Sequence, residues 1–274
     1  MAMRDGAELH YRHWDVPNRR GVVVAIHGIQ SHSGWYAASS AQMASAGYEV
    51  VFLDRRGSGL NRHSRGDAAD CRVLVDDLCE CVGSVRRRLG GVPLHLEAIS
   101  WGAKLACAAL ILHPELVDSL ILVGPGLVPR VDVSFSVKLQ TAAALLLDPR
   151  KPFDVPLGDA RLFTENPDRI AYIESDPLSL RKCTARFLYA TRRLDRLVRR
   201  RARDLHVPLL MMLAGRDRIV DNDAVRRLFE RFSCRPKETI TYGQASHTLE
   251  FEPDPVPVFE DMIRWLNTRS DTRG

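Results

Sequence analysis

The chain has 274 residues, of which 45% are hydrophobic and 27% are charged, and its formal net charge is +5. This balance excludes a wholly disordered chain, and the length supports a large core without a stabilising metal or disulfide framework. The arginine surplus is diffuse rather than a basic stripe, which argues against nucleic-acid binding. Neither a signal peptide nor a membrane span of roughly 18 apolar residues is visible, so we expect a cytoplasmic protein.

Short aliphatic or β-branched runs recur along the chain, and most of them end at Gly, Asp, Ser or His. The runs are Val22–Ile26, Glu49–Leu53, Pro93–Ile99, Leu120–Val123, Leu209–Leu213 and Thr239–Tyr242. Helical patterns cover residues 36–46, 73–89, 101–112, 222–232 and 255–268. Because nearly continuous apolar strands are typical of a parallel sheet with helices on both faces, we predict an α/β fold with a mostly parallel central sheet.

Residues 126–206 break this alternation. They contain no convincing strand, and several prolines separate short helical runs, among them Phe135–Leu147 and Leu178–Arg203. We predict that this segment is a helical cap inserted above the sheet, between a first part of the core (residues 1–125) and a second part (residues 207–274). The alternative interpretation is that it contains only further crossover helices.

The run that ends at Ile99 is followed directly by Ser100 and then by a helical pattern. A serine on a tight strand-to-helix turn presents its hydroxyl above the carboxyl edge of the sheet, and the residues two before and two after it must be small. Ala98 and Gly102 satisfy this requirement, although the first of these positions is usually glycine. The sequence therefore predicts that Ser100 is a nucleophile.

A serine hydroxyl becomes a nucleophile when a histidine removes its proton and a carboxylate orients that histidine. Asp217 lies just past the end of the penultimate run, and His247 follows the last run. We predict that both converge on Ser100, because the carboxyl ends of parallel strands meet at one sheet edge. Asp221 and Asp223 are alternative acids, with Asp221 the first choice of the two, but both lie farther past the strand end.

Ester cleavage through a serine also requires two backbone N–H groups that stabilise the oxyanion of the transition state. Trp101, the residue after the nucleophile, is predicted to provide one of them, and Ile29 in the loop after the first run is predicted to provide the other. Gly28 allows this loop to turn inward without a Cβ atom. We assign His27 to structural hydrogen bonding of the loop, because it follows an early strand and so does not fit the expected order of the site residues.

These segments together resemble the α/β-hydrolase superfamily, and within it the serine hydrolases similar to monoacylglycerol lipases and lysophospholipases. Residues 27–36 (HGIQSHSGWY) resemble the H-G-x-x-E-H-S-G-R-Y stretch of that group, residues 54–59 (DRRGSG) its D-x-R-G-x-G loop, and residues 214–220 (AGRDRIV) with residues 246–247 its acid and base segments. The resemblance spans residues 21–266. It implies a Ser-Asp-His triad, a helical cap that lines an acyl pocket, and no cofactor.

The chain departs from the pattern of this group at Ser31, Trp35 and Ala98, where Glu, Arg and Gly are usual. These changes bear on the substrate range more than on the chemistry. Gln30, Trp35 and Ile219 flank the predicted site and are candidate substrate-binding residues. The sequence predicts no metal site.

The leading hypothesis is a serine carboxylic-ester hydrolase that acts through an acyl-enzyme on a small molecule, a single-chain acyl ester such as monoacylglycerol or lysophospholipid. The apolar run Phe135–Leu147 has two interpretations: it packs on the sheet as an ordinary helix, or it lines the acyl pocket and makes a peripheral contact with lipid. A serine peptidase or amidase with the same triad is an alternative, because acidic residues of the cap could bind a peptide amino terminus. These residues are Glu165, Asp168, Glu174 and Asp176. A non-catalytic receptor with this fold is the alternative of another class, and the oligomeric state is not predicted.

Overall fold

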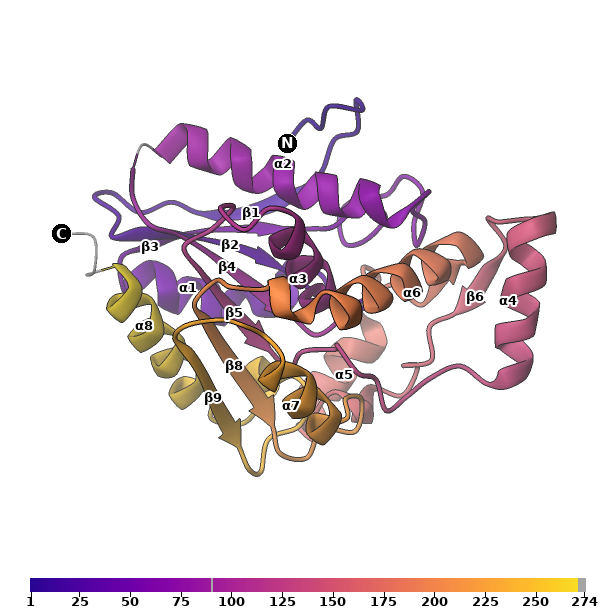
Figure 1. Cartoon of the computed structure of the whole chain (residues 1–274). Helices are drawn as coiled ribbons and strands as arrows, with labels where there is room; N and C mark the ends of the chain where they lie inside the picture. The colour runs from indigo at the N-terminus through magenta and orange to yellow at the C-terminus, as the bar shows by residue number, and fades with distance from the viewer. Residues whose placement is uncertain (90, 271–274) are drawn as a thin grey trace.

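Seven strands form the central sheet in the order β1-β3-β2-β4-β5-β8-β9 in the computed structural model, which describes residues 1–89 and 91–270 (Figure 1). The strands are β1 (Tyr11–Trp14), β2 (Gly21–Ile26), β3 (Tyr48–Leu53), β4 (Leu94–Ile99), β5 (Ser119–Val123), β8 (Leu209–Ala214) and β9 (Lys237–Tyr242). All neighbouring strands are parallel except β1, which runs antiparallel to β3. The predicted fold class, a mostly parallel α/β sheet, is confirmed.

Burial explains which strands the sequence reveals. Every residue of β2, β3, β4, β5 and β8 is buried, so these strands are apolar on both faces and stand out as continuous runs. The edge strand β1 is mostly half-buried, and its residues form no aliphatic run. For this reason β1 could not be predicted from the sequence.

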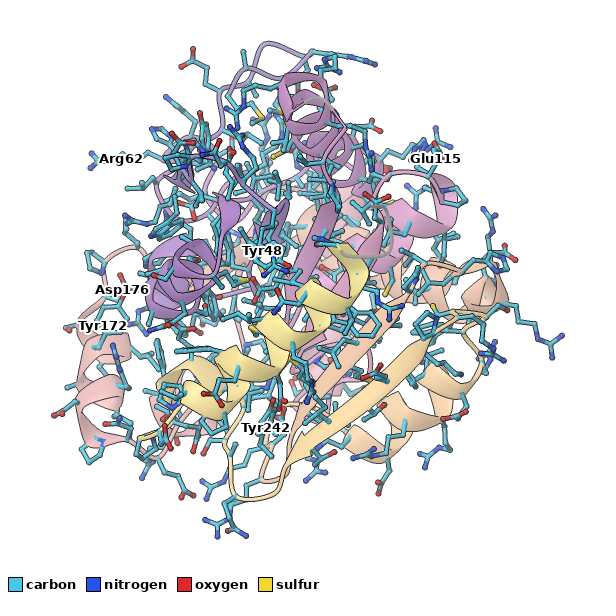
Figure 2. All side chains as sticks on the ribbon, turned by 90° about the vertical axis from the view of Figure 1, so that its left-hand side faces the viewer. Tyr48, Arg62, Glu115, Tyr172, Asp176 and Tyr242 are labelled. Atoms are coloured by element: carbon cyan, nitrogen blue, oxygen red, sulfur yellow. The ribbon has the colours of Figure 1, made fainter. Side chains whose placement is uncertain are left out.

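Helices cover both faces of the sheet. Helices α1 (Ala37–Ser45) and α8 (Val256–Ser270) lie on one face, and α2 (Cys71–Leu89), α3 (Gly102–Leu112) and α7 (Asn222–Glu230) lie on the other (Figure 1). This division follows from the right-handedness of β-α-β crossovers. The crossover through α1 leads from β2 to β3, whereas the crossovers through α2, α3 and α7 lead across the sheet in the opposite direction. Crossovers of the same hand that run in opposite directions place their helices on opposite faces. In the side view of Figure 2, Tyr48 lies beside α8, where its hydroxyl donates to Asn267 Oδ1 at 2.9 Å.

The segment between β5 and β8 lies beyond the carboxyl edge of the sheet and contains both helices and strands. Its elements are α4 (Phe135–Leu147), β6 (Pro152–Asp154), α5 (Pro167–Ser175), β7 (Lys182–Thr184) and α6 (Ala185–Arg200). Short 3-10 helices occur at Ser33–Tyr36, Ala160–Leu162, Ala202–Asp204 and Leu249–Phe251. Helix α6 packs against α3, and α4 packs against α6 at the side of the molecule farthest from the sheet (Figure 1).

Two expectations for this segment were wrong. It does contain strands, because β6 and β7 pair antiparallel in a two-stranded sheet whose strands are too short to leave a pattern. The helix expected from Leu178 begins only at Ala185, because the preceding residues belong to β7 and the Thr184 side chain caps α6 by accepting from the Phe187 amide. Among the residues that the structure describes, no helix has the length and apolar character needed to cross a membrane.

Candidate active site

Ser100 lies on a sharp turn between β4 and α3, and its backbone has a φ of 51°. Left-handed backbone is strained for a residue with a side chain, and it is found where a turn must present a functional group. The turn is closely packed, because a Cβ atom on Gly102 would lie 2.8 Å from the carbonyl oxygens of Ile26 and His27. A Cβ atom on Gly126 would lie 3.0 Å from the backbone of Ser100 and Trp101. Small residues therefore hold the serine at the end of its strand.

The structure brings Ser100, Asp217 and His247 together, although they come from three different loops. His247 Nε2 lies 2.9 Å from Ser100 Oγ, and His247 Nδ1 lies 2.7 Å from Asp217 Oδ2. Asp217 and His247 are both buried. The alternative acid Asp221 is engaged elsewhere, because its side chain caps α7 by accepting from the Ala224 amide at 3.0 Å.

The surroundings of Asp217 favour its ionised form. Burial by itself raises the pKa of this carboxyl, but the charge of His247 and the hydrogen bond from its ring outweigh burial. The amides of Ile219 and Val220 also donate to Asp217 Oδ1, at 2.8 and 2.9 Å. The net effect is a pKa below the ordinary value for aspartate. An ionised Asp217 can orient the imidazole of His247 and stabilise its protonated form.

The backbone amides of Ile29 and Trp101 are the two groups predicted to bind an oxyanion. Ile29 and Trp101 line the same cavity as Ser100. In the part of the chain that the structure describes, neither of their amides donates a hydrogen bond to another residue. Unpaired N–H groups at such a position can accept the charge of an oxyanion.

The loop that carries Ile29 is supported from beneath by buried polar groups. The Arg55 guanidinium donates to the Ile29 carbonyl and stacks on the rings of Trp101 and Phe187, at 5.0 Å from each ring centroid. His27 accepts from the Arg55 amide at 3.1 Å and donates through Nδ1 to the Gly28 carbonyl at 2.8 Å. Burial lowers the pKa of His27 to about 3, so this ring is neutral and its role in the structure is to hold the loop.

A cavity of about 410 Å³ opens above Ser100. Its apolar wall comes mainly from the segment between β5 and β8, and Ile219 contributes from the loop after β8. The apolar lining residues include Val131, Val133, Leu145, Val155, Leu157, Leu188 and Val220. The run Phe135–Leu147, expected to line an acyl pocket, contributes Leu145 to this wall, and Ile219 also lines it. The other apolar lining residues were not predicted, because residues that lie far apart in the chain carry no shared motif.

Two of the predicted substrate-binding residues do not line this cavity. The Trp35 ring packs against Phe163 and Phe251, with centroid distances of 5.6 and 5.2 Å, and its indole donates to Asp176 at 2.8 Å. Gln30 is also buried, and its carbonyl accepts from the Leu180 amide at 2.8 Å. Both residues fix the loop after β2 against the inserted segment.

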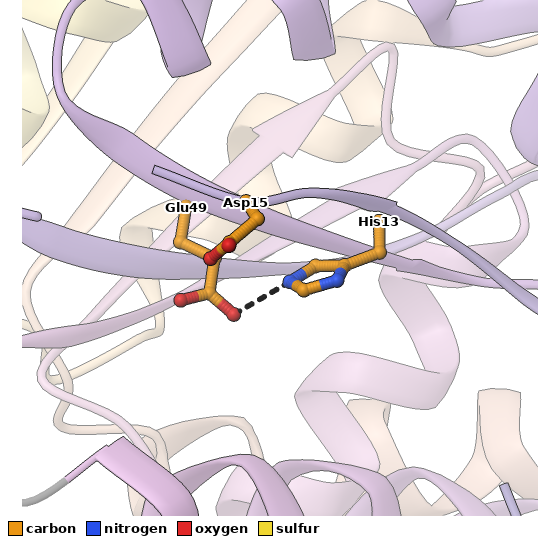
Figure 3. Close-up of side chains that lie close together, drawn as sticks. All are labelled: His13, Asp15 and Glu49. Atoms are coloured by element: carbon orange, nitrogen blue, oxygen red, sulfur yellow. Dashed lines mark hydrogen bonds and ion pairs between the residues drawn. The ribbon is translucent and has the colours of Figure 1, made fainter. Parts of the chain in front are cut away.

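His13, Asp15 and Glu49 bring three potential metal-ligand atoms within 4.8 Å of one another (Figure 3). The Glu49 carboxylate already has cationic partners, because it accepts from the guanidinium groups of Arg19 and of Arg88, the latter at 2.9 Å. His13 Nε2 lies 2.7 Å from Glu49 Oε1. Glu49 also lies near the amino end of β3, at the opposite edge of the sheet from Ser100. We therefore interpret the group as an ion-pair cluster.

The fold and the geometry around Ser100 define a serine hydrolase of the α/β-hydrolase superfamily. The sequence model of the family described as "Serine aminopeptidase, S33" matches residues 17–254. The chain belongs to this family.

Relatives with assigned names match nearly the whole chain. A monoglyceride lipase from Homo sapiens is 26% identical over 98% of this chain and 90% of its own length. A monoacylglycerol lipase from Mycolicibacterium smegmatis is 27% identical, over 90% of this chain and 88% of its own length. The crystal structure of a monoacylglycerol lipase from Paleococcus ferrophilus superposes with a TM-score of 0.85 at 23% identity, covering 96% of this chain and 100% of the other. That likeness shows the shared fold.

Proposed function

We propose that this serine ester hydrolase acts on single-chain acyl esters, such as monoacylglycerols or lysophospholipids, through an acyl-enzyme formed on Ser100. The observation that carries the proposal is the 2.9 Å contact between Ser100 Oγ and His247 Nε2 at the base of a cavity whose wall is mainly apolar. Such a cavity can bind an acyl chain while the polar base of the site performs the chemistry.

The geometry supports a two-step reaction. In the first step, His247 Nε2 takes the hydroxyl proton while Ser100 Oγ attacks the ester carbonyl, and the amides of Ile29 and Trp101 stabilise the oxyanion. The intermediate collapses, the ester C–O bond breaks, and His247 returns the proton to the departing alcohol. In the second step, water gives a proton to His247 and attacks the acyl-enzyme. The fatty acid leaves, and the proton returns to Ser100.

The charges around the cavity favour an ester over a peptide amino terminus. None of the four cap carboxylates considered for amino-terminus binding lines the cavity. Asp176, for example, is buried and accepts from His32 at 3.0 Å, and Asp168 lies in the first turn of α5. The two carboxylates that do line it, Asp132 and Asp195, are each within 2.7 Å of a lysine ammonium. A peptide ammonium would have to compete with these partners.

We also infer that helix α4 contacts a lipid surface. Lys138, Thr141, Ala142 and Leu145 of α4 face the cavity. Other apolar side chains of α4 face solvent, with exposed fractions of 74% for Phe135, 57% for Leu139, 88% for Leu146 and 87% for Leu147. Exposed apolar groups on a peripheral helix favour insertion into the boundary between lipid headgroups and acyl chains. An acyl substrate could then pass from the lipid to the cavity along one helix.

The proposed activity is tested with wild type and Ser100→Ala on monolauroylglycerol, lauroyl lysophosphatidylcholine and nitrophenyl esters of increasing chain length. We expect hydrolysis of long single-chain esters by wild type, and we expect the variant to lose turnover while its melting temperature is kept. A fluorophosphonate probe should label Ser100 in the wild type only. Activity confined to acetyl or aminoacyl substrates would contradict the acyl-ester assignment, and an unlabelled wild type would favour the receptor alternative.

A further inference from the structure

Lys104 is a buried cation in the wall of the substrate cavity. It lies in the first turn of α3, three residues after Trp101, and its side chain is 5% exposed. Its ammonium lies 2.7 Å from Asp195 Oδ1 of α6, and both residues line the cavity. An ammonium has three N–H donors, and its contact with Asp195 is an ion pair without hydrogen-bond geometry, since Asp195 Oδ1 has no hydrogen-bond partner in the described part of the chain. Lys104 therefore keeps hydrogen-bonding capacity at a wall that is otherwise largely apolar.

The charges that line the cavity do not cancel. Lys104, Lys138 and Arg192 are opposed by Asp132 and Asp195. Asp132 lies 2.6 Å from the Lys138 ammonium and 3.1 Å from the Arg192 guanidinium, so a single carboxylate serves two cations. The cavity thus has a cationic excess on the side where α6 meets α3 and the start of α4.

The position of the Lys104–Asp195 pair is not explained by helix packing alone. Helix α6 is already held against α3 by the Trp101 ring, which stacks on Phe187 at a centroid distance of 5.4 Å and donates to Thr191 at 3.2 Å. Taking two charges out of water is costly, and an apolar pair of similar volume often stabilises a protein equally well. A buried ion pair in the wall of a substrate cavity is better explained by recognition of a polar group.

We propose that Lys104 binds an anionic oxygen group of the substrate, a phosphate or a carboxylate, and that this side of the cavity selects anionic acyl esters over neutral ones. The inference rests on the proposed ester hydrolase function and specifies its substrate class. Asp195 moderates the selection, because it neutralises part of the Lys104 charge when no substrate is bound. The anionic group could belong to the leaving alcohol, as in a lysophospholipid, or to the far end of the acyl chain.

The test compares matched pairs of substrates. The first pair is 1-lauroylglycerol and 1-lauroylglycerol 3-phosphate, which differ only in the phosphate. The second pair is nitrophenyl laurate and the mono-nitrophenyl ester of dodecanedioic acid, which differ at the far end of the chain. The measured quantity is the anion preference, defined as kcat/KM for the anionic substrate divided by kcat/KM for its neutral partner. The pair that responds to the variants identifies the source of the anionic group.

The two partners of the ion pair should shift the anion preference in opposite directions. Lys104→Met should lower it about tenfold, corresponding to about 1.4 kcal/mol, whereas Asp195→Asn should raise it because the lysine charge is no longer compensated. Lys182→Met is the matched control, since it makes the same change in net charge at a side chain that is 66% exposed and outside the cavity. If Lys104→Met folds poorly, the double variant Lys104→Met/Asp195→Leu replaces the pair by apolar groups and should show the same low preference.

The possible failures are distinguishable. If both single variants lower the rates on all substrates and leave the anion preference unchanged, the pair is structural and the inference is wrong. If the wild type hydrolyses the neutral esters but neither anionic one, the inference is also overturned, while the proposed ester hydrolase function stands. If no ester is hydrolysed and Ser100 is not labelled by a fluorophosphonate, the proposed function itself fails.

Discussion

Asp176 accepts a hydrogen bond at 3.0 Å from Nε2 of His32, and both side chains are buried. Asp176 follows α5, whereas His32 belongs to the loop after β2. The same carboxylate oxygen accepts from the indole of Trp35 at 2.8 Å and from Ser179 at 2.9 Å. Asp176 thus joins the segment inserted between β5 and β8 to the loop that carries Ile29. Rigidity of that loop matters because the Ile29 amide must already be in place when charge develops on the substrate.

We predict that Asp176→Asn lowers kcat about tenfold and destabilises the protein by about 1–3 kcal/mol, because buried donors lose a charged acceptor. Asp67→Asn is the control, since Asp67 also joins the core to the inserted segment, through Thr184 and Arg186, and among the described residues its side chain makes no hydrogen bond to the Ile29 loop. Urea unfolding and kcat are measured for both variants. An equal loss of kcat in both would show that Asp176 acts through stability alone.

The contribution of Asp176 to stability should depend on pH. Burial raises the pKa of this carboxyl, but hydrogen bonds from His32, Trp35 and the Leu178 amide outweigh it and leave the pKa well below the ordinary value. Because the pKa of Asp176 is lower in the folded state, its carboxylate adds stability at pH values above the unfolded-state pKa of about 3.9. This stability is lost as the pH falls towards the pKa of the folded state. The stability difference between wild type and Asp176→Asn should therefore be largest near neutral pH and shrink in acid.

Asp217→Asn should reduce kcat by about 10³-fold or more, because an amide cannot stabilise the protonated His247 and favours the wrong tautomer of its ring. Asp221→Asn should retain nearly all activity, because the Asp221 side chain caps α7 and an asparagine can do the same. Steady-state kinetics on a nitrophenyl ester compare the two. The opposite ranking would transfer the role of the acid to Asp221.

Gly102→Ala should destabilise the protein by about 1–3 kcal/mol and lower kcat, because its methyl group would press on the carbonyls of Ile26 and His27 and displace the Ser100 turn. Gly158→Ala is the matched control, since a Cβ atom there meets no atom within 4 Å. Thermal unfolding and fluorophosphonate labelling rates are the measurements. A Gly102→Ala protein as stable and as reactive as the control would contradict the packing argument for this turn.

Stability should fall with rising pH because of Glu97 of β4. It is fully buried beside Glu250 and a cavity of about 10 Å³, and neither of its carboxylate oxygens has a hydrogen-bond partner in the described part of the chain. Burial raises the pKa of Glu97 to about 8, with a smaller contribution from the charge of Glu250. The unfolded chain has a glutamate pKa of about 4.3. Between this pH and the folded-state pKa of Glu97, the folded state keeps the Glu97 proton while the unfolded state has lost it. The free energy of unfolding therefore decreases as the pH rises through this range.

Glu97→Gln removes this dependence, because an amide does not ionise. The variant should therefore gain stability relative to wild type between pH 5 and pH 8.5, measured as the difference between their melting temperatures at each pH. A constant difference across this range would mean that Glu97 does not titrate there.

The double variant Leu146→Glu/Leu147→Glu should lower partitioning onto vesicles of phosphatidylcholine and phosphatidylglycerol by about tenfold or more, because it removes apolar surface from the exposed face of α4. Turnover of a water-soluble nitrophenyl ester should be unchanged, since neither leucine lines the cavity. Leu112→Glu, at an exposed leucine on the last turn of α3, is the control. Cosedimentation that is insensitive to the α4 change would place lipid contact elsewhere.

The buried strands of the sheet and the meeting of Ser100, Asp217 and His247 were predictable from the amino-acid sequence. Buried parallel strands appear as uninterrupted apolar runs, and their carboxyl ends share one edge, so the order of residues along the chain is enough to bring these three side chains together. The glycine that the tight Ser100 turn requires was recognisable for the same local reason.

The surroundings of that site depend on tertiary packing. Lys104 meets Asp195 because α6 returns across α3, and no local pattern records a contact between residues so far apart in the chain. Trp35 lies in a motif that suggested substrate contact, but its ring is packed among Phe163 and Phe251. Local geometry and chain order can be read from sequence, whereas the lining of a cavity depends on how separate elements pack, and packing is a property of the whole fold.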